Sequence, residues 1–262
     1  MSMTQLPGGA PVLSPPLLPA ATPGEAGGRS GTILAGRRRL LAGAMALAVA
    51  APLFVLYPAI RPFSDEKSLQ AAQAWSSTAW TVAHTLAVLG FIGVILGLLA
   101  LHLSLAATPA RRLSLRALVV SWIGAGLTLP YYGAETYALR AIGRQALADH
   151  NAGMLTLAGQ VRGGPGEVIF GIGLGLLAVG GVTAAVAAWR SAALTKWGAA
   201  LLGAGLVLFI PQFWGSQPVR IAHGVVMAAG CLLLAAGLWR RGTAGPDAGS
   251  AAGAPLPAGR GL

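Results

Sequence analysis

Residues Leu127 to Gly143 read LTLPYYGAETYALRAIG, a stretch that begins inside a long apolar run and ends among charged residues. It contains a helix-kinking proline, Pro130, and a carboxylate, Glu135, together with three of the four tyrosines, Tyr131, Tyr132 and Tyr137. The uncharged run starts at Ala117 and would form an α-helix about 27 Å long. Because the apolar core of a bilayer is about 30 Å thick, Glu135 is predicted near a membrane interface and not at the membrane centre.

The composition of the whole chain also indicates a membrane protein. Hydrophobic residues make up 55% of the sequence and charged residues only 10%, whereas an ordinary soluble domain is about 25% charged. The net charge of +11 does not indicate nucleic-acid binding, because the basic residues separate apolar runs and do not cluster with aromatic residues. The single cysteine, Cys231, lies inside the last run and is predicted to act as a small buried apolar residue.

The predicted fold class is all-α, a polytopic transmembrane helix bundle within residues 37–241. Runs of about 20 apolar residues are long enough to cross a bilayer, and the sequence contains six such spans, at about 40–60, 80–103, 117–139, 168–189, 197–214 and 221–239. The third helix is expected to continue as an amphipathic extension through Arg140 and Arg144. The Gly-, Pro- and Ala-rich flanks, residues 1–36 and 242–262, are predicted to be disordered cytoplasmic tails.

Three consecutive arginines, Arg37 to Arg39, precede the first apolar run and allow two interpretations. Paired arginines before an apolar stretch that contains Ala48-Val49-Ala50 resemble an export signal with a cleavage site. The apolar run continues well past this triplet, through Leu56. Its length favours an uncleaved first span.

The distribution of charge predicts the orientation. With the N-terminus inside, the inner segments hold twelve basic residues and the outer segments six, while five of the seven acids are outside. Both termini are therefore predicted to be cytoplasmic, in a multi-pass protein of the bacterial plasma membrane. The outgoing spans end near Pro58, Pro130 and Pro211, which suggests a three-hairpin repeat, although chance could also produce so short a similarity.

Four ionisable residues are predicted at a similar depth near the outer face: His84, Glu135, Glu167 and His223. Such residues are costly inside lipid and usually face the protein interior. Glu135, Glu167, Tyr131 and Tyr132 are therefore the candidate pocket residues, and His84 and His223 are the candidate metal ligands. We expect Glu135, His84 and His223 to face one another.

Three interpretations of the histidines are open. They could bond backbone or tyrosine groups between packed helices, with the glutamates solvated at the rim. They could bind zinc or iron together with one or two carboxylates. They could also hold a haem between opposite helices, although transmembrane electron transfer usually needs a second haem, and His102 has no histidine partner at its depth.

No HExxH, CxxC, phosphate-binding glycine loop or nucleophile elbow occurs in the sequence, so the catalytic residues are unknown. The leading hypothesis is a small-molecule or ion-handling protein, or an accessory subunit of a membrane complex, with a polar pocket at the outer face. The alternative is a metal- or haem-dependent membrane enzyme or redox protein that uses His84 and His223. The span centres offer little polarity beyond Ser121 and Thr183, which argues against a charged transport substrate. The expected partners are the lipid bilayer and a membrane protein or second copy, and no nucleic acid.

Three segments carry a resemblance to known sequences: Tyr57 to Glu66 (YPAIRPFSDE), Leu129 to Arg144 (LPYYGAETYALRAIGR) and Pro218 to Gly224 (PVRIAHG). They resemble a group of uncharacterised six-span integral membrane proteins of GC-rich actinobacteria. The resemblance covers roughly Arg37 to Arg241. It implies a membrane location and no known activity, so it supplies no catalytic residue.

Overall fold

The computed structural model describes residues 23–191 and 195–244, and every regular element in these ranges is a helix. The chain divides into two compact units, Met1–Ala35 and Gly36–Leu262. The first contributes only the start of helix α1 (Pro23–Ile60) to the described residues. The rest of α1 and all later helices lie in the second unit.

Five helices are long and apolar enough to cross a membrane: α1, α3 (Thr78–Ser104), α4 (Arg111–Ala148), α6 (Pro165–Arg190) and α8 (Gln217–Thr243). Their outward faces carry large exposed apolar side chains. On α6, for example, Val168, Ile172 and Val179 are each more than half exposed. So much exposed apolar surface is unfavourable in water and favourable in a hydrocarbon phase. The helices are therefore those of a multi-pass membrane protein.

The predicted fifth span, residues 197–214, is not one continuous helix. Helix α7 (Lys196–Val207) has 12 residues, about 18 Å at 1.5 Å per residue. The chain then turns and forms a short 3₁₀ helix, η2 (Pro211–Trp214). Proline has no N–H to continue the α-helical bonding and fits the first turn of a new helix, so Pro211 suits the first position of η2.

Two predictions about the flanks also need correction. Helix α1 begins at Pro23, inside the predicted tail 1–36, and α8 runs two residues into the predicted tail 242–262. Residues 1–22 and 245–262 lie outside the described residues. The segments between α1 and α3 and between α4 and α6, which lie between predicted spans, contain three short helices, α2 (Leu69–Ser76), η1 (Ala152–Leu155) and α5 (Thr156–Arg162).

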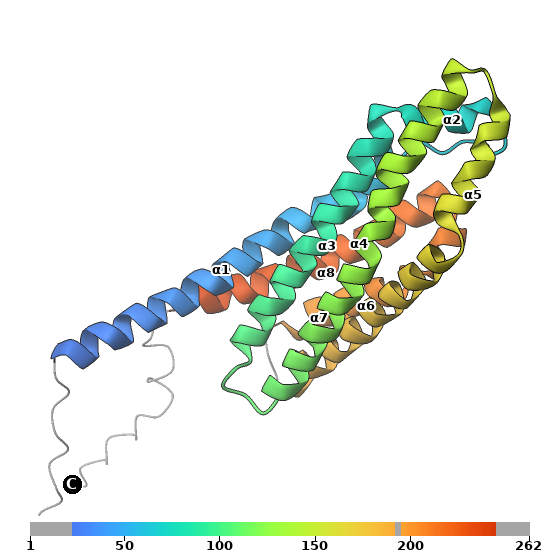
Figure 1. Ribbon diagram of the computed structural model, residues 1–262. Helices are drawn as coiled ribbons and strands as arrows, with labels where there is room; N and C mark the ends of the chain where they lie inside the picture. Colours follow the sequence, from blue (N-terminus) through green and yellow to red (C-terminus); the bar gives the residue numbers. More distant parts are fainter. Residues whose placement is uncertain (1–22, 192–194, 245–262) are drawn as a thin grey trace, which may run out of the picture. The chain divides into compact units, whose positions relative to one another are not determined.

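The predicted extension of the third helix is confirmed, because α4 continues to Ala148. Its last turns carry the three short helices, which pack around it at one end of the bundle (Figure 1). Trp75, Leu139 and Leu155 form part of an apolar core there that is separate from the main one. This extra layer covers the end of the bundle at which α1 ends and α8 begins.

The long helices and α7 pack in chain order. Helix α3 contacts α4, α4 contacts α6, α6 contacts α7, and α7 contacts α8. Helix α8 then contacts α1, where a Cβ added to Gly224 would lie 2.3 Å from the Phe54 carbonyl oxygen. Helix α1 meets α3 in the same way, with 2.8 Å between a Cβ on Gly93 and the Ala46 carbonyl oxygen. Small residues thus allow neighbouring backbones to approach closely, as is usual inside membranes.

One close approach between α4 and α6 is reciprocal. A Cβ on Gly124 would lie 2.7 Å from the Gly173 oxygen, and a Cβ on Gly173 would lie 2.8 Å from the Gly124 oxygen. By contrast, Gly171 and Gly175, the GxxxG pair in the sequence, would have nothing within 4 Å of an added Cβ in the described part of the chain. The α4–α6 contact matters for function because both helices continue from it into the walls of a cavity.

Candidate functional site

A cavity of about 400 Å³ lies at the end of the bundle where α1 ends and α8 begins. All four predicted pocket residues line it, namely Tyr131, Tyr132, Glu135 and Glu167. The rest of its lining comes from α1, the α1–α2 segment, α3, α5, α6, the α7–η2 turn, η2 and α8. A volume of this size is typical of sites for small organic ligands.

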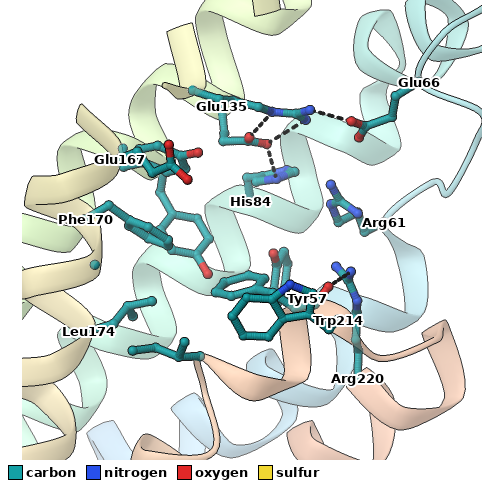
Figure 2. A pocket seen from close by; sticks show the side chains of 16 residues that line it. Tyr57, Arg61, Glu66, His84, Glu135, Glu167, Phe170, Leu174, Trp214 and Arg220 are labelled. Carbon is teal, nitrogen blue, oxygen red and sulfur yellow. Dashed lines mark hydrogen bonds and ion pairs between the residues drawn. The ribbon is translucent and has the colours of Figure 1, made fainter. Parts of the chain in front are cut away.

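Glu135 is the centre of a charged network at the top of the view in Figure 2. Its Oε1 accepts a hydrogen bond of 2.5 Å from Nε of Arg162, and its Oε2 lies 3.4 Å from Nη2 of the same guanidinium. Arg162 also donates from Nη1 to Oε2 of Glu66 at 2.7 Å. Burial alone would lower the pKa of Arg162, but Glu135 and Glu66 outweigh burial and raise it. One arginine on α5 thereby ties the α1–α2 segment to α4.

His84 is buried and joins this network from α3. Its Nδ1 lies 2.8 Å from the carbonyl oxygen of Trp80, and its Nε2 lies 3.5 Å from Oε2 of Glu135. A carbonyl oxygen can only accept, so Nδ1 must carry a hydrogen. The ring can therefore donate to Glu135 only when both of its nitrogens are protonated, and in that state the two residues form an ion pair.

Trp80 fixes the orientation of both partners. Its indole Nε1 donates to the backbone carbonyl of Glu135 at 2.8 Å. Its ring centroid lies 4.3 Å from that of His84. The structure thus brings Glu135 and His84 together, as expected, and it does so through an aromatic residue that the sequence analysis did not single out.

His223 does not join them. Its Nε2 donates to the carbonyl oxygen of Gly205 at 2.8 Å, and its ring lies against Phe209. In a continuous helix the Gly205 oxygen would accept from the N–H of Phe209, but that N–H bonds to Leu206 because α7 ends there. His223 therefore satisfies a carbonyl that the helix break leaves free. The expectation that it faces Glu135 and His84 is wrong. The depth of a residue along a helix does not determine toward which neighbouring helix its side chain points.

Arg220 stabilises the same break from α8. Its Nη2 donates to the carbonyl of Phe213 at 2.5 Å and its Nε to the carbonyl of Gly215 at 3.0 Å. Non-helical backbone at membrane depth is tolerated where protein groups satisfy it or where it lines a cavity. Both conditions hold here, because Ile210 and Phe213 line the cavity.

Two hydrogen-bond donors in the cavity wall have no partner. Nε of Arg61 and the hydroxyl of Tyr132 are buried and make no hydrogen bond within the described residues. The Arg61 guanidinium lies over the Trp80 ring at 4.6 Å and near the Phe63 ring at 5.0 Å. Leaving a buried donor unpaired costs about 1–3 kcal/mol, so these two groups mark the part of the wall that is not satisfied by the protein itself.

The opposite wall is apolar. Phe170 and Leu174 on α6 face the cavity from the side opposite Arg61 and Arg220 (Figure 2), and Ile210 and Phe213 complete the apolar lining. Tyr131 stacks on Phe170 with ring centroids 4.2 Å apart. Glu167 also lines the cavity, but it lies in the exposed first turn of α6. The cavity therefore combines basic donors with an aromatic and aliphatic surface.

The residues do not fit a metal or haem site. Among the described residues, no group of three or more His, Cys, Asp or Glu side chains could hold a metal ion. His223 lies outside the cavity that His84 lines, and Nε2 of His223 is bonded to Gly205. The two histidines therefore offer no shared position for zinc, iron or haem.

Comparisons with protein-family models, with curated proteins and with solved structures found no match. The resemblance to actinobacterial six-span proteins stays a prediction.

Sequence reasoning missed four charged residues of this site: Arg61, Glu66, Arg162 and Arg220. They entered the sequence analysis only as charges that set the topology. Two signals were available. Arg61 and Glu66 lie directly after a span, and Arg162 and Arg220 are the only basic residues in the segments just before α6 and at the start of α8.

Proposed function

We propose that the protein is a six-crossing membrane protein that binds a small organic molecule in this cavity at the outer face of a bacterial plasma membrane. The observation that carries the binding function is the cavity itself, about 400 Å³ in volume, whose lining includes Arg61 and Tyr132, two residues with buried donors that lack partners in the described protein. Pockets of this kind, mostly apolar with a few convergent polar groups, are the usual form of small-molecule sites.

In this proposal the segment from Lys196 to Trp214 completes a sixth crossing. Helix α7 supplies most of the length, and the turn and η2 supply the rest at the outer end. Arg220 and His223 satisfy carbonyls that the break would otherwise leave free. Six crossings place both termini inside, in agreement with the excess of basic residues on that side. The pairs α1–α3, α4–α6 and α7–α8 are then three hairpins.

We favour a protein that binds the small molecule without carrying it across the membrane over a transporter of a charged substrate. Beside the cavity the α4–α6 interface is closed at Gly124 and Gly173, where the two backbones approach closely. The buried side chain at this level of α6, Leu174, is apolar. The polar groups deeper in the bundle are engaged within it, because Thr128 donates to the Gly124 carbonyl and His223 to the Gly205 carbonyl. The space that continues from Arg220 toward His223 is only about 10 Å³. A transporter needs polar groups or an opening through the midplane.

The test is to identify what the protein retains. The full chain is purified in a neutral maltoside detergent, and small molecules released by denaturation are identified by mass spectrometry. A compound present at close to one per protein, and depleted when Leu174→Trp fills the cavity, is the expected result. Ile172→Trp is the matched control, because Ile172 is exposed on the same helix and lies outside the cavity. Equal recovery from both variants would contradict the proposal.

A further inference from the structure

The two basic residues on the α1 and α8 side of the cavity lack acidic partners. Within the described residues the ion pairs within 4.0 Å are those of Glu135 with His84 and with Arg162, and of Glu66 with Arg162. Arg61 and Arg220 belong to none of them. Both guanidinium groups approach the same ring, Phe63, with Cζ at 5.0 Å and 5.1 Å from its centroid. Two like charges are thus held near each other on one wall.

The acidic residues of the cavity do not neutralise this wall. Glu135 and Glu66 both bond to Arg162, whose single positive charge leaves one negative charge in excess. This excess lies next to Glu66, whose side chain is 52% exposed, so water and salt screen it. Glu167 lies on the wall opposite Arg61 in Figure 2 and is exposed, where water and salt screen its charge. The free positive charge is therefore concentrated at Arg61 and Arg220.

From these contacts we infer that the cavity binds an anionic amphiphile, an oxyanion such as phosphate attached to an apolar chain. The inference rests on the proposed binding function and names its ligand class. The oxyanion accepts from the guanidinium of Arg61 and from the hydroxyl of Tyr132, whose side chains turn toward it because Nε and the hydroxyl have no partners in the described protein, and it is attracted by Arg220. The apolar chain lies against Phe170, Leu174 and Ile210. Arginine is well suited to this role, because its planar guanidinium donates several hydrogen bonds to one phosphate.

The probes are octyl phosphate, octyltrimethylammonium and inorganic phosphate, titrated into purified full-length protein in maltoside micelles. Trp214 lines the cavity and is 82% exposed, so its fluorescence is the readout, and a Trp214→Phe variant identifies the part of the signal that comes from the cavity. We expect saturable binding of octyl phosphate, with octyltrimethylammonium and inorganic phosphate each at least about tenfold weaker.

Arg61→Gln and Tyr132→Phe test the donors. Each removes a donor that bonds to nothing in the described protein, and each should weaken octyl phosphate binding, by about tenfold for the charged group and less for the hydroxyl. Arg144→Gln and Tyr137→Phe are the matched controls, because both residues are exposed at the same end of the bundle and line no part of the cavity. Protection of buried Cys231 from thiol reagents verifies that each variant is folded.

The source of the amphiphile is decided in nanodiscs. If discs of phosphatidylcholine with one-fifth phosphatidylglycerol reduce octyl phosphate binding relative to discs of phosphatidylcholine alone, the ligand is a membrane lipid headgroup, and if they do not, it is a soluble amphiphile. Unchanged affinity in Arg61→Gln, or tighter binding of the cationic probe, would overturn the anionic ligand and leave the binding site in place. If inorganic phosphate binds as tightly as octyl phosphate, the ligand needs no apolar chain, and that part of the inference is overturned. No Trp214-dependent signal from any probe, together with no retained compound, would defeat the proposed function as well.

Discussion

The ion pair between Glu135 and Arg162 should contribute far more to stability than the pair between Glu66 and Arg162. The same guanidinium makes both contacts, so the comparison is internally controlled. The Glu135 side chain is 12% exposed and bonds to Arg162 at 2.5 Å, whereas the Glu66 side chain is 52% exposed. Water screens the second pair and is largely excluded from the first.

The magnitudes follow from this difference in burial. A buried hydrogen bond to a charged group contributes about 1.5–3 kcal/mol, and Glu135→Gln keeps the shape while removing the charge. An exposed pair contributes about 0–1 kcal/mol, so Glu66→Gln should change stability little. With about 2–4 °C per kcal/mol for a protein of this size, the expected loss of melting temperature is about 3–12 °C for Glu135→Gln and less than about 4 °C for Glu66→Gln.

Cys231 provides the assay. It is the only cysteine in the sequence and is fully buried in α8, so a thiol-reactive fluorophore reports unfolding as the temperature rises. The expected losses of melting temperature for the two glutamate variants overlap near 3–4 °C. The decisive measurement is therefore a pair of double-mutant cycles with Arg162→Gln, one for each glutamate. We expect a coupling energy at least about twice as large for Glu135 as for Glu66. Equal coupling energies would refute the argument from burial.

Three further predictions concern the helices. Gly173→Leu should abolish folding or expression, because its Cβ would lie 2.8 Å from the Gly124 oxygen, while Gly175→Leu on the same helix should be tolerated; comparable fluorescence size-exclusion profiles for the two would contradict this. Pro130→Ala restores a backbone donor inside α4 next to the tyrosines of the cavity, so it should alter octyl phosphate affinity more than membrane insertion, and loss of insertion would assign the proline to folding instead. A reporter fused after Arg241 should be cytoplasmic, and one fused near Asp149 should be external. An external carboxyl terminus would contradict the six-crossing topology.

The sequence by itself determined the features that depend on local composition. Hydropathy located the five long helices, because transfer of a segment into hydrocarbon depends on the side chains of that segment. It also predicted the extension of α4, which continues to Ala148. The break at Pro211 was partly visible, since the outgoing span was predicted to end near this proline.

Only the tertiary structure decided which residues at one depth meet. His84 and His223 were predicted at the same level, yet His84 contacts Glu135 while His223 caps the end of α7. Arg162 reaches Glu135 across 27 positions of sequence and Glu66 across 96. Depth along a helix is a local property, whereas the direction in which a side chain points depends on how each helix is rotated against its neighbours. That rotation is set by contacts such as Gly124 against Gly173, which no single segment contains.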